Sequence, residues 1–144
     1  DGNCGIIVTT REKAKELSAD SNIEIQIISY GFARVKPMFM PAATVPASRM
    51  ALANAGLTIA DIKVLKTHNP FAVNDLVVSK EMGFDLMKMN NYGSSLIYGH
   101  PQGPTAGRAI IEMIEELVMA GGGYGLFTGC AAGDTAASLI VRVG

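Results

Sequence analysis

Short apolar runs alternate with helical hydrophobic periodicities along most of the chain. Apolar, β-branched runs, some with a strict apolar–polar alternation, predict strands over residues 4–9, 23–32, 64–67, 124–128 and 138–143. Apolar residues at helical spacing predict helices over residues 10–19, 46–56 and 72–82, and a further helix that precedes the glycines at 121–123. Because strands and helices alternate, we expect a layered α/β domain.

The helix before residue 121 has the clearest amphipathic pattern. One face collects Ile110, Ile111, Ile114, Leu117 and Val118, and the other collects Glu112, Glu115 and Glu116. We interpret the acidic side as a solvated face. Other helix ends carry local signals: Thr9 and Glu12 form a capping-box pattern, and Gly56 and Gly83 are expected to end their helices.

The composition indicates one globular domain and argues against several classes of partner. The chain has 144 residues, of which 49% are hydrophobic and 17% charged, and a formal net charge of −1. Without a basic stripe, a nucleic-acid role has no electrostatic footprint. No apolar run reaches the roughly 20 residues that a membrane span requires. Cys4 and Cys130 lie in apolar or Gly/Ala surroundings, which favours a cytoplasmic location over a disulfide scaffold, and we expect Cys4 in the core.

Three residues could carry chemistry, and each lies where a predicted strand ends or in a loop. His68 follows the strand at 64–67, His100 lies in a stretch without periodicity, and Cys130 follows the strand at 124–128. Reactive side chains beyond strand ends are where α/β enzymes assemble their sites. Their wide spacing does not indicate a metal site.

Four motifs carry a specific resemblance to the C-terminal half of the thiolase superfamily. Residues 90–108 (NNYGSSLIYGHPQGPTAGR) resemble the signature with an Asn, a Gly pair and then Gly-His-Pro-x-Gly. Residues 124–133 (YGLFTGCAAG) resemble the closing signature, in which Cys precedes a Gly-rich turn. Residues 68–72 (HNPFA) align with the motif Asn-or-His, Glu, Ala, Phe, Ala, in a version similar to sterol-carrier-type thiolases. Asp1-Gly2, which we interpret as the start of an excised or processed domain, matches the Asp-Gly that opens this half.

The resemblance implies a fold and a set of partners. Residues 1–144 would form a thiolase C-terminal domain with a mixed central sheet of about five strands and helices on both faces. The nucleophilic cysteine would belong to an N-terminal domain, so the isolated chain would be inactive. The complete enzyme would be an acyl-CoA C-acyltransferase, similar to acetyl-CoA acetyltransferases, that forms or cleaves 3-oxoacyl-CoA. Coenzyme A would be a substrate and no cofactor would be needed. Homodimers or tetramers are usual in the family.

The resemblance also implies roles for individual residues. His100 would activate the nucleophilic cysteine and then help to hold the thioester oxygen. Cys130 would be the acid/base that moves the α-proton or the proton of incoming CoA. His68 would replace the Asn that positions a water in the oxyanion hole. Gly133, with the neighbouring Ala132 N–H, would hold the second oxyanion.

Departures from the family pattern leave two alternatives open. Asn69 replaces the acidic residue expected after His68, although Phe71 of the same substrate-lining motif is retained. Ala132-Gly133-Asp134 replaces a Gly triplet, and these changes would suit a non-catalytic lipid-binding scaffold. The other alternative is a condensing enzyme that uses acyl carrier protein, a sister class with a Cys-His-His arrangement that lacks the C-terminal cysteine. Cys130 therefore favours a thiolase.

Overall fold

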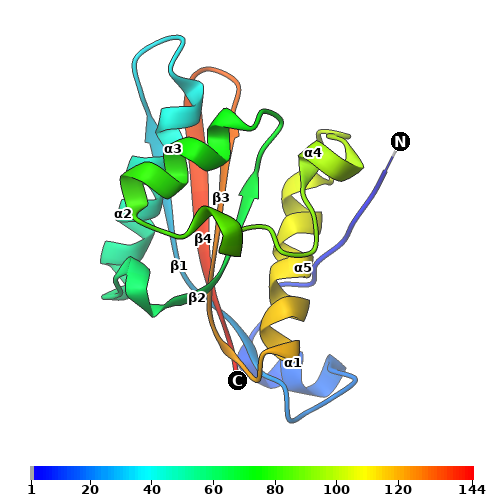
Figure 1. The fold of residues 1–144 in the computed structure, drawn as a ribbon. Coiled ribbons are helices and arrows are strands. Elements are labelled where there is room, and N and C mark those ends of the chain that lie inside the picture. The colour runs from blue at the N-terminus through cyan, green and yellow to red at the C-terminus, as the bar shows by residue number, and fades with distance from the viewer. Residues whose placement is uncertain (1) are drawn as a thin grey trace.

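A computed structural model describes residues 2–144, so Asp1 of the opening motif lies outside the described residues. A mixed sheet of β1 (Ile25–Arg34), β2 (Ile62–His68), β3 (Gly123–Ala131) and β4 (Thr135–Val143) forms the centre in the order β1-β4-β3-β2 (Figure 1). β2 and β3 are parallel, and the other neighbouring pairs are antiparallel. The mixed α/β class is confirmed, with four strands among the described residues instead of about five.

Helices cover both faces of the sheet, as expected. They are α1 (Arg11–Leu17), α2 (Thr44–Ala55), α3 (Val73–Met82), the short α4 (Ser95–Tyr98) and α5 (Thr105–Met119), with 3-10 turns η1 (Met40–Ala43), η2 (Ile59–Asp61) and η3 (Leu86–Lys88). α2 and α3 pack on one face, and α5 packs on the other (Figure 1). Gly56 and Gly83 end α2 and α3 in the left-handed conformation, with φ of 67° and 75°.

Alternation along the strands produces two apolar cores, because successive side chains point to opposite faces of a sheet. The first core lies under α2 and α3 and contains Ala51, Leu52, Leu65, Val78, Leu126 and Ile140. The second lies under α5 and contains Val64, Met113, Leu117, Phe127, Val141 and Val143. Gly31 lets α2 approach β1 closely, because a Cβ there would collide with the backbone of Ala47 and Ala51. The two cores fix the sheet between the helices.

The predicted first strand is wrong. Residues 4–9 have no strand partner and run beside α5 instead of joining the sheet (Figure 1). Ile7 is 78% exposed, and Cys4, expected in the core, is also exposed, with its thiol 3.3 Å from the Pro104 carbonyl. An apolar β-branched run predicts a strand only where a sheet edge is available for it. The cap of α1 is also shifted by one residue from Thr9, because the Thr10 hydroxyl accepts from Lys13 N–H.

The interpretation of the acidic side of α5 as solvated is wrong for one residue. Glu116 is only 8% exposed, and its carboxylate lies 3.4 Å from the ammonium of Lys66, a lysine on β2. Glu115 is exposed, as expected. The deepest apolar contacts of α5 come from Met113 and Leu117, whereas much of the predicted aliphatic face, including Ile110, Ile111, Ile114 and Val118, is only half-buried.

One part of the sheet surface remains uncovered. α5 lies against β2 and β3, and β1 at the far side carries exposed apolar residues on the same face. Tyr30 and Phe32 are 65% and 64% exposed, and the register with β4 places Ile25 and Ile27 on this face too. We call these four residues the open sheet face. No helix among residues 2–144 is long and apolar enough to cross a membrane.

Candidate active site

Three segments that are distant in sequence bring His68, His100 and Cys130 to one end of the sheet. His68 is the last residue of β2, and Cys130 is the second-last of β3. Because the two strands are parallel and His68 lies opposite Gly129, their carboxyl ends meet. His100 reaches the same place from the loop between α4 and α5. The two strand ends and the His100 loop therefore meet at this end of the sheet.

Direct contacts link the two imidazoles to each other and to the strand that bears the cysteine. His68 Nε2 lies 3.2 Å from His100 Nδ1, with the ring centroids 4.3 Å apart. His68 Nδ1 lies 3.1 Å from the carbonyl oxygen of Cys130. His100 Nδ1 is also 2.9 Å from the hydroxyl of Thr105, in the first turn of α5. Both rings are thus held by defined partners, although His100 itself is exposed.

These partners determine where the protons lie. A carbonyl only accepts, so His68 Nδ1 carries a proton and donates it to the Cys130 carbonyl. Burial lowers the pKa of His68 below its ordinary value of 6.5 and the neighbouring His100 adds to this effect, against the hydrogen bond to Cys130. His68 is therefore neutral at pH 7, and its Nε2 accepts from His100 Nδ1. The Nε2 atom of His100 is left with a free lone pair and can act as a base.

Cys130 is a buried thiol with one polar partner. Its side chain is 6% exposed, and the Asn74 amide donates to Sγ over 3.1 Å. Burial raises the pKa of the thiol above its ordinary 9.0, although the Asn74 hydrogen bond acts in the opposite direction. Cys130 therefore holds its proton at neutral pH, as a general acid must. Asn74 was missed in the sequence, where its place in the first turn of α3 after the His68 motif was the available signal.

A carboxylate lies near the site in a different position from the one the motif provides. Asp75, on α3, accepts hydrogen bonds from the Thr67 hydroxyl, the Asn69 amide and the Asn90 amide. Asn90 also bonds Thr67 through both atoms of its amide, at 2.8 Å each. Asn69 is 1% exposed and points to Asp75. The orienting carboxylate that appeared lost at Asn69 is thus supplied six residues later, which the sequence analysis missed.

The remaining predicted residues surround the site more loosely. Ala132 and Gly133 form the exposed turn between β3 and β4, where Gly133 has φ of 80° and Asp134 has φ of 58°. Arg34 Nε donates to the Gly133 carbonyl over 3.2 Å. Phe71 is 60% exposed just after β2. No hydrogen bond within residues 2–144 joins Ala132, Gly133 or Phe71 to either imidazole.

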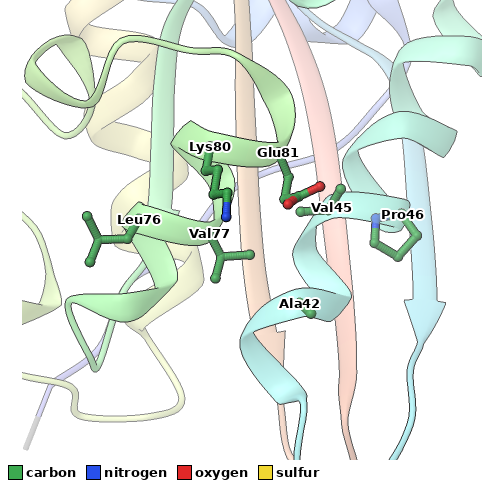
Figure 2. Close-up of a pocket in the computed structure, with 7 residues that line it drawn as sticks. All are labelled: Ala42, Val45, Pro46, Leu76, Val77, Lys80 and Glu81. Atoms are coloured by element: carbon green, nitrogen blue, oxygen red, sulfur yellow. The ribbon is translucent and has the colours of Figure 1, made fainter.

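Two other features lie apart from this chemistry. Figure 2 shows an open groove between α2 and α3, lined by Ala42, Val45, Pro46, Leu76, Val77, Lys80 and Glu81. None of the three site residues lines it. In the part of the chain that the structure describes, no group of three or more His, Cys, Asp or Glu side chains is arranged to hold a metal ion.

The raised pKa of Cys130 predicts a low reactivity toward iodoacetamide. At pH 7–8 we expect Cys130 to be alkylated more slowly than the exposed Cys4, because only the thiolate attacks and burial favours the thiol. The rate should increase with pH and should still be rising at 9.0, the ordinary pKa of the thiol. Time-resolved peptide mass spectrometry follows both cysteines in one sample, with Cys4 as the internal reference. Equal rates at pH 7 would contradict the assignment of Cys130 as a protonated acid.

Comparisons with known proteins identify the family of the chain. Residues 21–143 match the family described as "Thiolase, C-terminal domain". An acetyl-CoA acetyltransferase of Syntrophomonas wolfei is 34% identical over 144 residues, covering 99% of this chain and 36% of that protein. A 3-ketoacyl-CoA thiolase of Pseudoalteromonas atlantica is 36% identical, with the same coverage of 99% and 36%.

A solved structure extends the similarity to three dimensions. The acetyl-CoA acetyltransferase of Bacillus anthracis has a TM-score of 0.84 and 31% identity, over 94% of this chain and 34% of that chain. This chain spans 36% of the length of the curated relatives named above. The family match covers most of the chain and includes His68, His100 and Cys130. The chain therefore belongs to the thiolase family and corresponds to its C-terminal domain.

Proposed function

We propose that this chain is the C-terminal half of an acyl-CoA C-acyltransferase that forms or cleaves 3-oxoacyl-CoA by Claisen chemistry with coenzyme A. One observation carries the proposal: at the carboxyl ends of β2 and β3 the two imidazoles contact each other, and His68 contacts the carbonyl of Cys130, whose thiol is buried. Similarity to an acetyl-CoA acetyltransferase and a 3-ketoacyl-CoA thiolase supports it. Residues 1–144 would form the C-terminal domain.

In the cleavage direction, His100 Nε2 accepts the proton of a nucleophilic cysteine from the N-terminal half. The thiolate attacks the 3-oxo carbonyl, and the bond between carbons 2 and 3 breaks. The shortened acyl group stays on the cysteine as an acyl-enzyme, and the leaving carbanion, carbon 2 of acetyl-CoA, takes the Cys130 proton. The Cys130 thiolate then accepts the proton of incoming CoA, whose sulfur attacks the acyl-enzyme and releases the cysteine thiolate, which takes its proton back from His100. Protons and electron pairs balance over the cycle.

The other predicted residues support these steps. His68 fixes the tautomer of His100 through its Nε2, in addition to the role in the oxyanion hole that the resemblance implies. The Ala132 and Gly133 N–H groups, in the turn directly after β3, would stabilise the second oxyanion. Phe71, which is exposed beside the site, would contact the acyl-CoA. Asn69 would act through Asp75, which orients Thr67 at the end of β2.

The open sheet face fits the missing half as its partner. Four apolar residues of β1, including two aromatic ones, lie beside the half-buried aliphatic flank of α5. Exposed apolar surface of this kind marks an interaction site. Relatives that are about three times longer provide an N-terminal domain that could cover it. A homodimer or tetramer of the complete enzyme, in the cytoplasm, completes the proposal.

The experiment compares this chain alone with the same chain joined to its upstream half. CoA-dependent cleavage of a 3-oxoacyl-CoA is followed by the loss of the absorbance of its enolate. We expect cleavage only with both halves, since the nucleophile lies upstream, and circular dichroism verifies that the separate chain is folded. Measurable thiolysis by the folded chain alone, or none by the joined protein, would refute the proposal.

The paired imidazoles also bear on the sister class that uses acyl carrier protein. Enzymes of that class have a Cys-His-His arrangement, and His68 and His100 would fit its two histidine positions. The buried thiol at Cys130, however, occupies the position of the family's acid/base and favours a thiolase, as do the named relatives. The lipid-binding scaffold is less favoured, because Asp75 replaces the missing carboxylate and both imidazoles have defined partners.

A further inference from the structure

A buried lysine lies on the same strand as His68, two residues before it. The side chain of Lys66 is 1% exposed, and its position two residues before His68 places both on the face of β2 that α5 covers. Its ammonium lies 3.4 Å from Glu116 and 4.0 Å from Glu112 and makes no hydrogen bond. Lysines are seldom buried so completely, and an apolar residue would avoid the loss of hydration. The position therefore calls for an explanation beyond stability.

The lysine belongs to a charge cluster of two cations and two carboxylates. Arg108 lies 2.9 Å from Glu112 on the next turn of α5. Glu116 accepts a second contact, from the Asn91 amide at 2.6 Å. The charges of Lys66, Arg108, Glu112 and Glu116 therefore balance within one group. If Lys66 were removed, two carboxylates four residues apart on a helix would repel each other, one of them buried.

The loop that carries His100 rests on this cluster at three points. Asn91 bonds Glu116, the Tyr92 ring lies 5.7 Å from the Lys66 ammonium, and the Tyr98 ring lies 4.3 Å from the Arg108 guanidinium. The Tyr98 hydroxyl donates to the Tyr92 carbonyl over 3.1 Å and closes the loop on itself. Tyr98 is two residues before His100. The loop and its histidine are thus anchored to α5 through charged groups.

We propose that Lys66 is a positioning residue for His100: it holds Glu116 and the loop of residues 91–98 so that the imidazole meets His68 and Thr105. The inference rests on the function proposed above, in which His100 is the base. His100 Nδ1 keeps its partners at 3.2 and 2.9 Å only while the loop stays in place. A displacement of about 1 Å in such a group can reduce a rate by about 100-fold.

The test is Lys66→Met in the complete enzyme, joined to its upstream half. We expect kcat to fall about 10- to 100-fold while KM changes less than about threefold, because the base is displaced but the acyl-CoA still binds. Val64→Ala is the matched control, since Val64 is buried on the same strand and face without contacting the loop. It should lower the melting temperature and leave kcat within about twofold.

A double variant separates positioning from simple destabilisation. Lys66→Met combined with Glu116→Gln removes both opposite charges and retains an amide that Asn91 can contact. We expect it to recover most of the kcat that the single variant loses, since no unpaired carboxylate remains buried. Unchanged kcat in Lys66→Met, or an equal loss of kcat in Val64→Ala, would overturn the proposal.

If Lys66→Met does not fold, Asn91→Ala tests whether the contact between the loop and the charge cluster positions His100. Asn91 is exposed, so its truncation removes the contact between the loop and Glu116 with little risk to folding. We expect kcat to decrease at least about fivefold. This is less than the loss of about 100-fold for a displacement of about 1 Å, because only one of the three loop contacts is removed. Asn22→Ala, in an exposed turn, is the control. An unchanged kcat in Asn91→Ala would overturn the positioning role.

His100→Ala in the same enzyme distinguishes the two proposals. If it abolishes activity while the Lys66 and Asn91 variants remain fully active, only the positioning role fails. If His100→Ala itself retains activity, the proposed function fails, and the positioning role fails with it.

Discussion

Replacing Cys130 with serine is expected to reduce kcat of the complete enzyme about 10²- to 10⁴-fold, the range typical for the loss of a general acid or base. A serine hydroxyl is of similar size to the thiol but is a far weaker acid, so it cannot exchange protons efficiently with a carbanion and with CoA. Asn74, which bonds Sγ, would still have an acceptor at that position. The effect should therefore come from the chemistry and not from the packing.

Steady-state thiolysis with a 3-oxoacyl-CoA measures this effect. Cys4→Ser is the matched control, because Cys4 is an exposed thiol near the start of α5, and its kcat should remain within about twofold of the unchanged enzyme. If Cys130→Ser retains nearly normal turnover, the acid/base is a different group. The condensing-enzyme alternative, which needs no cysteine at this position, would then be preferred.

Replacing His100 with alanine is expected to reduce kcat/KM about 10³- to 10⁴-fold, because we propose that the residue acts both as a base and as an oxyanion donor. The nucleophilic cysteine would return to the reactivity of an ordinary thiol, whose pKa is about 8.5. Its alkylation by iodoacetamide at pH 7 should therefore slow as well. This second readout reports the activation step separately from carbon–carbon cleavage.

Gln102→Ala provides the control for His100→Ala. Gln102 is an exposed residue of the same loop and makes no side-chain hydrogen bond that would hold either imidazole. Both its turnover and the alkylation rate should stay within about twofold. If His100→Ala slows cleavage but leaves alkylation unchanged, His100 would serve the oxyanion and not the nucleophile.

The sequence predicted the elements that position the site, because their patterns are local. β2 and β3 were recognisable as short apolar runs, and Gly56 and Gly83 indicated where α2 and α3 end. The strand at 4–9 failed because pairing depends on which sheet edges the rest of the fold leaves free. The prediction that Glu116 is solvated failed because its partner, Lys66, is fifty residues earlier on another element.

The candidate site was predicted only in part, because its motifs are local in sequence whereas the partners of its side chains are not. Motif order identified His68, His100 and Cys130, and the structure joins the two rings to each other and His68 to the Cys130 carbonyl. Their catalytic roles stay predictions until the variants are measured. Asn74 and Asp75 were missed, because their place after the His68 motif does not reveal what an amide or a carboxylate on that helix faces.

The parallel pairing of β2 with β3 has a consequence for the order in which this domain folds. Parallel neighbours require a long crossover, and here it runs from the end of β2 to the start of β3 and includes α3, α4 and α5. His68 lies where the crossover begins, His100 lies within it, and Cys130 lies near the far end of β3. Contacts between such distant segments form slowly during folding. Until β2 and β3 have paired, the three residues of the proposed proton-transfer site would lie apart. The proposed activity would therefore appear only after the sheet has formed.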